Sequence, residues 1–283
     1  GAGGGKVQPN IAKKFFAAGG LKKMNPSDAD KARLVQAIAK HLQVLQQIPD
    51  FLTWLHVDPR TVREGPSATH GRGVFAARNI KAHTLVTLYP ASNEVSLCCE
   101  RHKGGSESSK VWRAESYAGP APDYAIFNGH PLFGENALRL EANPDADVQP
   151  GFLGHLINDV LMPPHDAEDV AYAHEYLKKT TNDTNCHAVP FPSGLIAIST
   201  SRDIKQGEEL LMTYTFGYNS QFMETMMAHP ELRKKMLTND FATSMKIASV
   251  KMESLTTETL RVHAEVELLS RELLCDVSDE EED

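Results

Sequence analysis

The sequence predicts a mixed α+β protein in which short strands lie between two helical segments. Apolar residues at three- to four-residue steps indicate a helix over 28–48, and a second such stripe begins near residue 257. From about residue 60 to 214, short apolar runs are separated by Gly and Pro, which is typical of strands. With 283 residues, 41% of them hydrophobic, the chain is long enough to bury a substantial core.

The N-terminal helical segment is predicted to span residues 1–58. Ser27 follows Asn25-Pro26 and is suited to be the N-cap of the main helix, because its hydroxyl can accept a bond from a free backbone N–H. The residues that form the apolar face of this helix are Leu34, Ile38, Leu42, Leu45 and Ile48.

The central segment is predicted to span residues 59–220 and to hold the strands. The expected strands lie at 73–76, 85–90, 195–199 and 209–214, and loops are expected at 101–110 and 141–150.

The last part of the chain is predicted to be a helical segment over 221–275, followed by an acidic tail. The residues that share one helical face are Val262, Val266, Leu269 and Leu273. Six of the eight residues in 276–283 are acidic, which indicates a solvated, disordered tail.

Charge and cysteine content restrict the partners of the chain. With 29 basic and 37 acidic residues the formal charge is −8, which disfavours direct binding of nucleic acid and suits a basic peptide. No apolar run approaches the roughly 20 residues that span a bilayer, so no membrane association is expected. The four cysteines form neither a disulfide framework nor a zinc spacing, which predicts an intracellular protein, nuclear or cytoplasmic, without a metal site.

Three sequence motifs carry the candidate chemistry. In His70-Gly71-Arg72-Gly73-Val74-Phe75-Ala76, two glycines flank Arg72 and let the backbone approach a ligand. In Gly154-His155-Leu156-Ile157-Asn158-Asp159, two polar side chains end an apolar run. The run Arg202-Asp203-Ile204-Lys205-Gln206-Gly207-Glu208-Glu209-Leu210 is a charged turn that leads to Tyr214. Each alone also fits an ordinary hairpin, a turn or a strand tyrosine.

Taken together and in this order, the motifs resemble those of the SET domain, the protein-lysine methyltransferase fold. The first motif is similar to the opening of that domain, Asn158-Asp159 to its Asn-His motif, and the third to its closing motif. The resemblance covers roughly residues 60–220 and implies a fold of small β-sheets around a knot-like crossing, flanked here by N- and C-terminal helices.

The resemblance also implies a cofactor and a set of site residues. S-adenosylmethionine would bind on one face, and a substrate lysine would enter through a narrow channel from the other. Asn158 would bind the polar end of the cofactor. Tyr214 would be the catalytic tyrosine and would also contact the cofactor. The remaining implied cofactor contacts are Arg72, Gly73, Val74 and Asp159, and the implied channel residues are Tyr89, Phe216 and Tyr218.

The sequence departs from the family pattern in several places. Asp159 stands where the family usually has His, which weakens one contact to adenine. The Pro-Asn that normally follows closely has its nearest equivalent in Thr184-Asn185-Cys186, so residues 160–183 form an insertion with helical spacing over 166–179. A rival alignment gives Asn182 the role of Asn158. Ala91 replaces a family Gly, and no cysteine-rich cluster follows the domain.

These features lead to one main hypothesis about function and two alternatives. The main hypothesis is S-adenosylmethionine-dependent methyl transfer to the side-chain amine of lysine in a protein substrate, with a histone tail as one candidate. The first alternative is a SET-fold binding or interaction module without activity, which the departures favour. The second is a scaffold whose helices at 28–48 and 221–275 form a dimer; the oligomeric state is left open.

Overall fold

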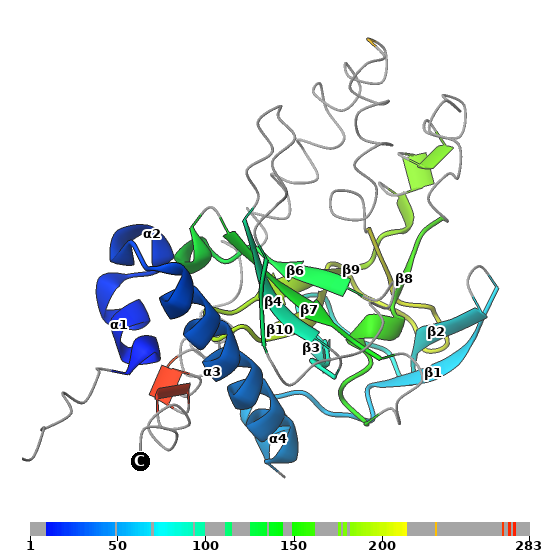
Figure 1. The fold of residues 1–283 in the computed structure, drawn as a ribbon. Helices are drawn as coiled ribbons and strands as arrows, with labels where there is room; N and C mark the ends of the chain where they lie inside the picture. The colour runs from blue at the N-terminus through cyan, green and yellow to red at the C-terminus, as the bar shows by residue number, and fades with distance from the viewer. Residues whose placement is uncertain are drawn as a thin grey trace, which may run out of the picture.

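The computed structural model has helices at one end, short sheets in the middle and a β-hairpin at the other end (Figure 1). It describes residues 10–48, 50–68, 71–92, 94–99, 111–114, 125–134, 136–143, 149–161, 175–176, 178–179, 182–213, 230, 268, 271–272 and 274–275.

The helical end consists of α1 (Ile11–Ala18), α2 (Leu21–Met24), α3 (Asp28–Gln47) and α4 (Phe51–Trp54). The N-cap prediction is confirmed, because the Ser27 hydroxyl accepts from the Asp30 N–H at 3.1 Å and Asp30 caps Ser27 in return. Four residues of the predicted apolar face are buried, and Ile48 packs against them as the C-cap: Leu34, Ile38, Leu42 and Leu45.

Helix α3 packs on a four-stranded antiparallel sheet with the order β5-β4-β7-β6. Its strands are β4 (Glu94–Cys99), β5 (Val111–Arg113), β6 (Ala125–Asn128) and β7 (Asn136–Glu141). Val95 pairs with Leu140 and Leu97 pairs with Leu138, and all four side chains are buried. Alternate residues of these strands therefore face the helix. None of these strands is among those predicted from the sequence.

A second sheet has the antiparallel order β3-β10-β9, with β3 (Leu85–Leu88), β9 (Cys186–Pro190) and β10 (Ile196–Thr200). The predicted strands at 85–90 and 195–199 correspond to β3 and β10. All five residues of β10 are buried, as expected for a central strand that is covered on both faces.

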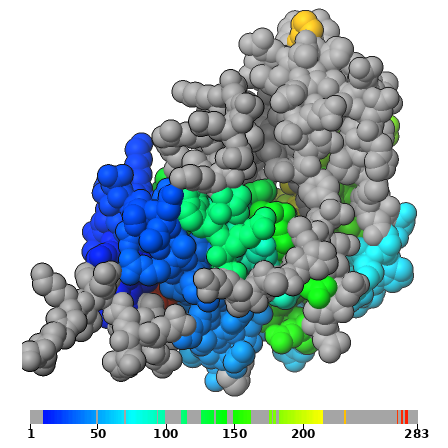
Figure 2. Space-filling view, in the orientation of Figure 1, coloured from blue at the N-terminus to red at the C-terminus, as the bar shows by residue number. Residues whose placement is uncertain are grey.

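Two smaller pairs complete the described sheets. Strands β1 (Val62–Ser67) and β2 (Gly71–Ala76) form an antiparallel hairpin, which lies at the surface (cyan in Figure 2). Strand β8 (Asn158–Asp159) runs parallel to β11 (Leu211–Met212), directly after the 3₁₀ turn η2 (Gly154–Leu156); a second turn, η1 (Pro131–Phe133), precedes β7. A strand was predicted at 209–214, and the described strand there, β11, is only two residues long.

Two apolar clusters support these elements. The larger joins the helices to the four-stranded sheet and to β3 and β10. The smaller lies beneath β2, β8 and β10, and its fully or nearly fully buried members include Val62, Val74, Ile80, Val86, Ile157, Ile198, Ile204 and Leu210. The smaller cluster forms the floor of the region where the three sequence motifs meet.

Only a few residues near the C-terminus are described, and they return to the N-terminal helices. Leu274 is fully buried in the larger core, and the Asn10 side chain donates to the Cys275 carbonyl at 2.8 Å. The four residues of the predicted helical stripe at 262–273, the loop at 101–110 and residues 144–148 of the loop at 141–150 lie outside the described residues, and so does the tail at 276–283. In the described part of the chain, no helix combines the length and apolar character needed to cross a membrane.

The observed architecture is the mixed α+β class of small sheets and few helices that the sequence predicts, which confirms the fold class. The parallel β8–β11 pair places the second motif beside the third. The knot-like crossing itself stays a prediction, as do the segment boundaries at 58, 220 and 275.

Candidate functional site

The first and third motifs meet through their backbones. Strand β2 bonds to the segment before β11, because the Leu210 N–H donates to the Val74 carbonyl at 2.7 Å and the Ala76 N–H to the Glu208 carbonyl at 2.9 Å. The Val74 side chain is fully buried in the smaller core. Any contact of Val74 with a ligand would therefore involve its backbone.

The Arg72 side chain lies across the hairpin surface and binds Glu64. Its Nε and Nη2 donate to the two carboxylate oxygens at 2.6 and 2.9 Å. These hydrogen bonds hold the pKa of Glu64 below its usual value. The side chain of Arg72 is thus engaged by Glu64, and its backbone carbonyl is the group that meets the second motif.

Asn158 is the residue of the second motif that reaches this carbonyl. Its Nδ2 donates to the Arg72 carbonyl oxygen at 2.8 Å and to Glu209 Oε1 at 3.0 Å. The rival Asn182 is exposed. The geometry thus supports Asn158 for the role at the first motif, although the choice for cofactor binding stays a prediction.

Glu209 is a central residue that the sequence analysis did not select. Its second oxygen, Oε2, accepts from the Ser67 hydroxyl at 3.2 Å, so its carboxylate joins β1 to β8. Its neighbour Glu208 points elsewhere and pairs with Arg202. The alternation of side chains along an extended segment explains why one glutamate of the pair faces the site and the other faces outward.

Gly73 is required by the close approach of these side chains. A β-carbon at this position would collide with Glu209 Oε1 and would lie 3.1 Å from both Asn158 Nδ2 and Ser67 Cβ. The three side chains therefore close directly over the backbone of β2, and a larger residue at position 73 would force the Glu209 carboxylate to move.

Asp159, which replaces the family's usual His, is buried and holds the inserted segment. Its Oδ1 accepts from the Val160 N–H and its Oδ2 from the Tyr176 hydroxyl, both at 2.6 Å. The Tyr176 hydroxyl also lies 3.3 Å from Thr213 Oγ1. Residues 175–176, 178–179 and 182–183 of the insertion are helical, whereas 160–161 form a bend; the rest of the predicted helix lies outside the described residues.

Asn185 fixes the third motif from the other side. Its Nδ2 donates to the Glu209 carbonyl at 2.7 Å, its Oδ1 accepts from the Leu211 N–H at 2.8 Å, and its own N–H donates to the Leu211 carbonyl. The adjacent Cys186 is fully buried, and this burial raises the pKa of its thiol and so favours the protonated form.

His155 and Tyr89 lie beneath the second motif. Burial, with a smaller contribution from the Arg72 charge, lowers the pKa of His155 to about 4, so its ring is neutral near pH 7. The Tyr89 ring meets it edge-on at 6.3 Å between centroids, and Tyr89 is only 5% exposed. A role for Tyr89 in a substrate channel stays a prediction.

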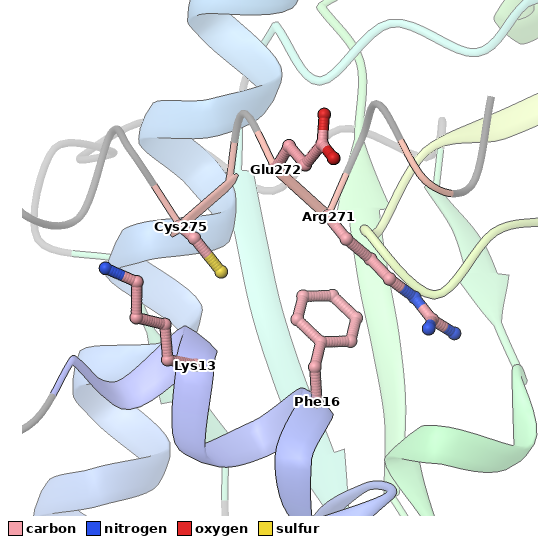
Figure 3. Close-up of a pocket in the computed structure, with 5 residues that line it drawn as sticks. All are labelled: Lys13, Phe16, Arg271, Glu272 and Cys275. Carbon is pink, nitrogen blue, oxygen red and sulfur yellow. The ribbon is translucent and has the colours of Figure 1, made fainter. Parts of the chain in front are cut away.

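Three predicted site residues, Tyr214, Phe216 and Tyr218, lie outside the described residues. A separate hollow of about 420 Å³ lies at the α1 end of the molecule, far along the chain from the three motifs (Figure 3). Its lining residues are Lys13, Phe16, Arg271, Glu272 and Cys275. Among the described residues, no cluster of His, Cys, Asp and Glu stands where it could hold a metal ion.

The comparison with protein families agrees with the motifs. The family model described as SET domain matches residues 71–215, just over half of the chain. It begins at the first glycine of the first motif and ends one residue beyond Tyr214. The resemblance that the sequence motifs indicated is therefore confirmed. No curated protein gives a significant match to this chain.

Solved structures resemble the chain only at low similarity. CpSET8 from Cryptosporidium is 14% identical, with a TM-score of 0.33, over 61% of this chain and 65% of that chain. The ATXR5 SET domain, solved in complex with a dimethylated histone H3, is 17% identical, with a TM-score of 0.33, over 64% and 70%. The methyltransferase domain of human PR domain-containing protein 2 is 17% identical, with a TM-score of 0.31, over 62% and 88%. The family assignment rests on the family model.

Proposed function

Because the chain belongs to the SET-domain family, we propose that it transfers a methyl group from S-adenosylmethionine to the side-chain amine of lysine in a protein substrate. SET domains are usually protein-lysine methyltransferases that use this cofactor. The observation that carries the proposal is the convergence of the three motifs, in which Asn158 bonds to the Arg72 backbone 86 residues away and to Glu209.

The residues at this point fit the polar end of the cofactor. An α-ammonium group needs hydrogen-bond acceptors, and the Arg72 carbonyl, the Glu209 carboxylate and the Asn158 amide oxygen are acceptors at one place. Arg72, Asn158 and Glu209 would thus hold the amino-acid end.

The chemistry that the site must perform on lysine is the removal of a proton and the alignment of the amine. Bound S-adenosylmethionine supplies a methyl group that is already activated on a sulfonium sulfur. A free lysine has a pKa near 10.4, so only about one molecule in a few thousand is neutral at pH 7. An apolar channel lowers that pKa, and alignment supplies several kcal/mol, up to roughly 7–11 in well-oriented cases.

Tyr214 is proposed to orient the amine. Its hydroxyl is suited to this task because it is neutral, whereas a carboxylate would stabilise the charged ammonium form. Phe216, Tyr218 and Tyr89 are proposed to line the channel. The substrate would be a basic peptide segment, a histone tail among the candidates, in keeping with the net charge of −8.

The experiment that tests the function is a methyl-transfer assay on a complex protein mixture. The full chain is incubated with isotopically labelled S-adenosylmethionine and a cell extract to which core histones are added, and lysine methylation is read by mass spectrometry. The proposal predicts label on lysine of one or a few proteins. Binding of the cofactor without any label on protein would contradict it.

One observation favours the alternative of a SET-fold binding module without activity. Asp159 replaces the family's His, and its carboxylate is occupied by Tyr176. If this replacement has removed the adenine contact, the chain would bind a partner without transfer. The same assay decides between the two, since the module predicts no transfer to any protein in the mixture.

A further inference from the structure

Two of the departures from the family pattern meet in a single buried contact. Asp159 stands at the position of the usual His, and residues 160–183 are inserted directly after it. Tyr176, on the inserted segment, donates its hydroxyl hydrogen to Asp159 Oδ2 at 2.6 Å. Both residues are 2% exposed, so this contact is shielded from water. The replaced residue and the inserted segment therefore belong to one arrangement.

A buried carboxylate needs such partners. Removing a charged group from water is costly unless hydrogen bonds replace its hydration. Asp159 receives two, one from the Val160 N–H and one from Tyr176. The Tyr176 hydroxyl therefore joins the inserted segment to Asp159 through a short buried hydrogen bond.

The Tyr176 hydroxyl also contacts the strand that leads to position 214. Because its only hydrogen is given to Asp159, its oxygen can act as an acceptor for the Thr213 hydroxyl, 3.3 Å away. Thr213 follows Met212, which pairs with Asp159 in the β8–β11 register. Tyr176 thus connects the last residue of β8 to the residue that follows β11.

This bridge is needed because the pair is short. Strands β8 and β11 are each two residues long, and so short a parallel pair has few backbone hydrogen bonds of its own. Asn185 fixes Leu211 on one side. On the other side, Tyr176 contacts Thr213, one residue before the proposed catalytic tyrosine.

We propose that Tyr176 is a positioning residue, which holds the end of β11 against β8 through Asp159 and Thr213 and so fixes where residue 214 begins. The catalytic consequence rests on the proposed function. Misplacement of a reacting group by about 1 Å can lower a rate on the order of a hundredfold. The inserted segment therefore contributes a residue that helps to build the site.

The first test is structural and needs neither cofactor nor substrate. Hydrogen–deuterium exchange is measured on the full chain for a peptide that spans residues 211–213, with a peptide from β10 as internal reference. Tyr176→Phe removes only the hydroxyl and is expected to speed exchange at 211–213 about tenfold while β10 is unchanged. Equal exchange in wild type and variant would overturn the proposal.

The second test uses the proteins that the wild-type chain methylates in the extract. Tyr176→Phe is expected to lower kcat about tenfold, with the cofactor Kd and KM within twofold of wild type. A merely structural loss would reduce the amount of folded enzyme and leave kcat per folded molecule unchanged, and that result would also overturn the proposal.

Thr213 supplies a matched pair of variants if Tyr176→Phe does not fold. Thr213→Val removes the hydroxyl and keeps the shape, so it is expected to speed exchange and lower kcat by about threefold, and Thr213→Ser is expected to restore both. If both Thr213 variants behave alike, the bridge to β11 is excluded. A wild-type chain that methylates nothing would remove the proposed function, whereas the exchange result would still decide whether Tyr176 holds the pair.

Discussion

Helix α3 and the β8–β11 pair are stabilised in opposite ways. The helix has 20 residues, its own capping box and an apolar face that needs only a sheet to pack against. The pair has two residues in each strand, and side chains from β1, from the inserted segment and from Asn185 hold it in place. One region is specified mainly by local sequence, whereas the other depends on contacts between residues far apart in the chain.

This difference separates stability from function. Loss of a core side chain on α3 is expected to reduce the free energy of unfolding and to leave the site intact, since no side chain of α3 reaches the three motifs in the contacts described. Loss of a group at the site is expected to lower cofactor binding or kcat and to leave the free energy of unfolding nearly unchanged. The following predictions test this separation, from the largest expected effect to the smallest.

The largest effect is expected for a core residue of α3. Leu42 is 3% exposed in the larger core, and Leu42→Ala is expected to lower the free energy of unfolding by about 2–5 kcal/mol. Chemical denaturation measures this change. The exposed Gln47→Ala on the same helix serves as control and is expected to change stability by less than about 0.5 kcal/mol. A fall in kcat per folded molecule in Leu42→Ala would contradict the separation.

The next effect is expected at Gly73. Because a β-carbon there would collide with Glu209, Gly73→Ala must displace the carboxylate and Asn158. We expect at least about a hundredfold loss of S-adenosylmethionine affinity, roughly 2.7 kcal/mol, measured by calorimetry. Gly129 has open space around its α-carbon, so Gly129→Ala is the control and should bind normally. Normal binding by Gly73→Ala would show that the crowded backbone is not the cofactor site.

A smaller effect is expected from pH, and it involves one histidine in each region. Burial lowers the pKa of both His41 on α3 and His155 at the site to about 4, against an ordinary value of 6.5. Between these values the unfolded chain binds more protons than the folded chain, so stability falls as pH decreases from 6.5 toward 4. At pH 5 each histidine is expected to cost about 1–2 kcal/mol relative to pH 8.

Denaturation curves at pH 8 and pH 5 measure this loss. His41→Leu is expected to remove the contribution of the α3 histidine and to reduce the difference between the two pH values by about 1–2 kcal/mol. Carboxylates with lowered pKa values, such as Asp30, act only at still lower pH and leave this window to the histidines. The same stability at both pH values would show that neither histidine is buried in its neutral form.

The same contrast explains what the sequence could and could not predict. The N-cap at Ser27 and the apolar face of α3 were predicted because a helix repeats every 3.6 residues. Strands β4 and β7 were not predicted, although apolar and polar residues alternate in Val95-Ser96-Leu97 and Leu138-Arg139-Leu140. Each alternating run is short and lies beside a long loop, so it did not stand out as a strand. Period-two signals over five or six residues are weak evidence unless the pairing partner is known.

The site was predicted in part for a similar reason. The motif resemblance identified Arg72, Gly73 and Asn158, which the structure brings together. It did not identify Glu209 or Tyr176, because their roles arise from side-chain contacts across 51 and 17 residues of chain. The adjacent pair Glu208-Glu209 was a signal for the first, since two neighbouring residues of a strand must face opposite sides. Tyr176 belonged to the helical spacing predicted over 166–179, but that pattern did not indicate its contact with Asp159.

The measurement that tests the central claim most directly is the binding of S-adenosylmethionine to two asparagine variants of the full chain. If Asn158 holds the polar end of the cofactor beside Arg72, Asn158→Ala weakens binding at least about tenfold, roughly 1.4 kcal/mol, while the exposed Asn182→Ala stays within twofold of wild type. Thermal unfolding of both variants confirms that each remains folded. Weakened binding in Asn182→Ala with normal binding in Asn158→Ala would contradict the account.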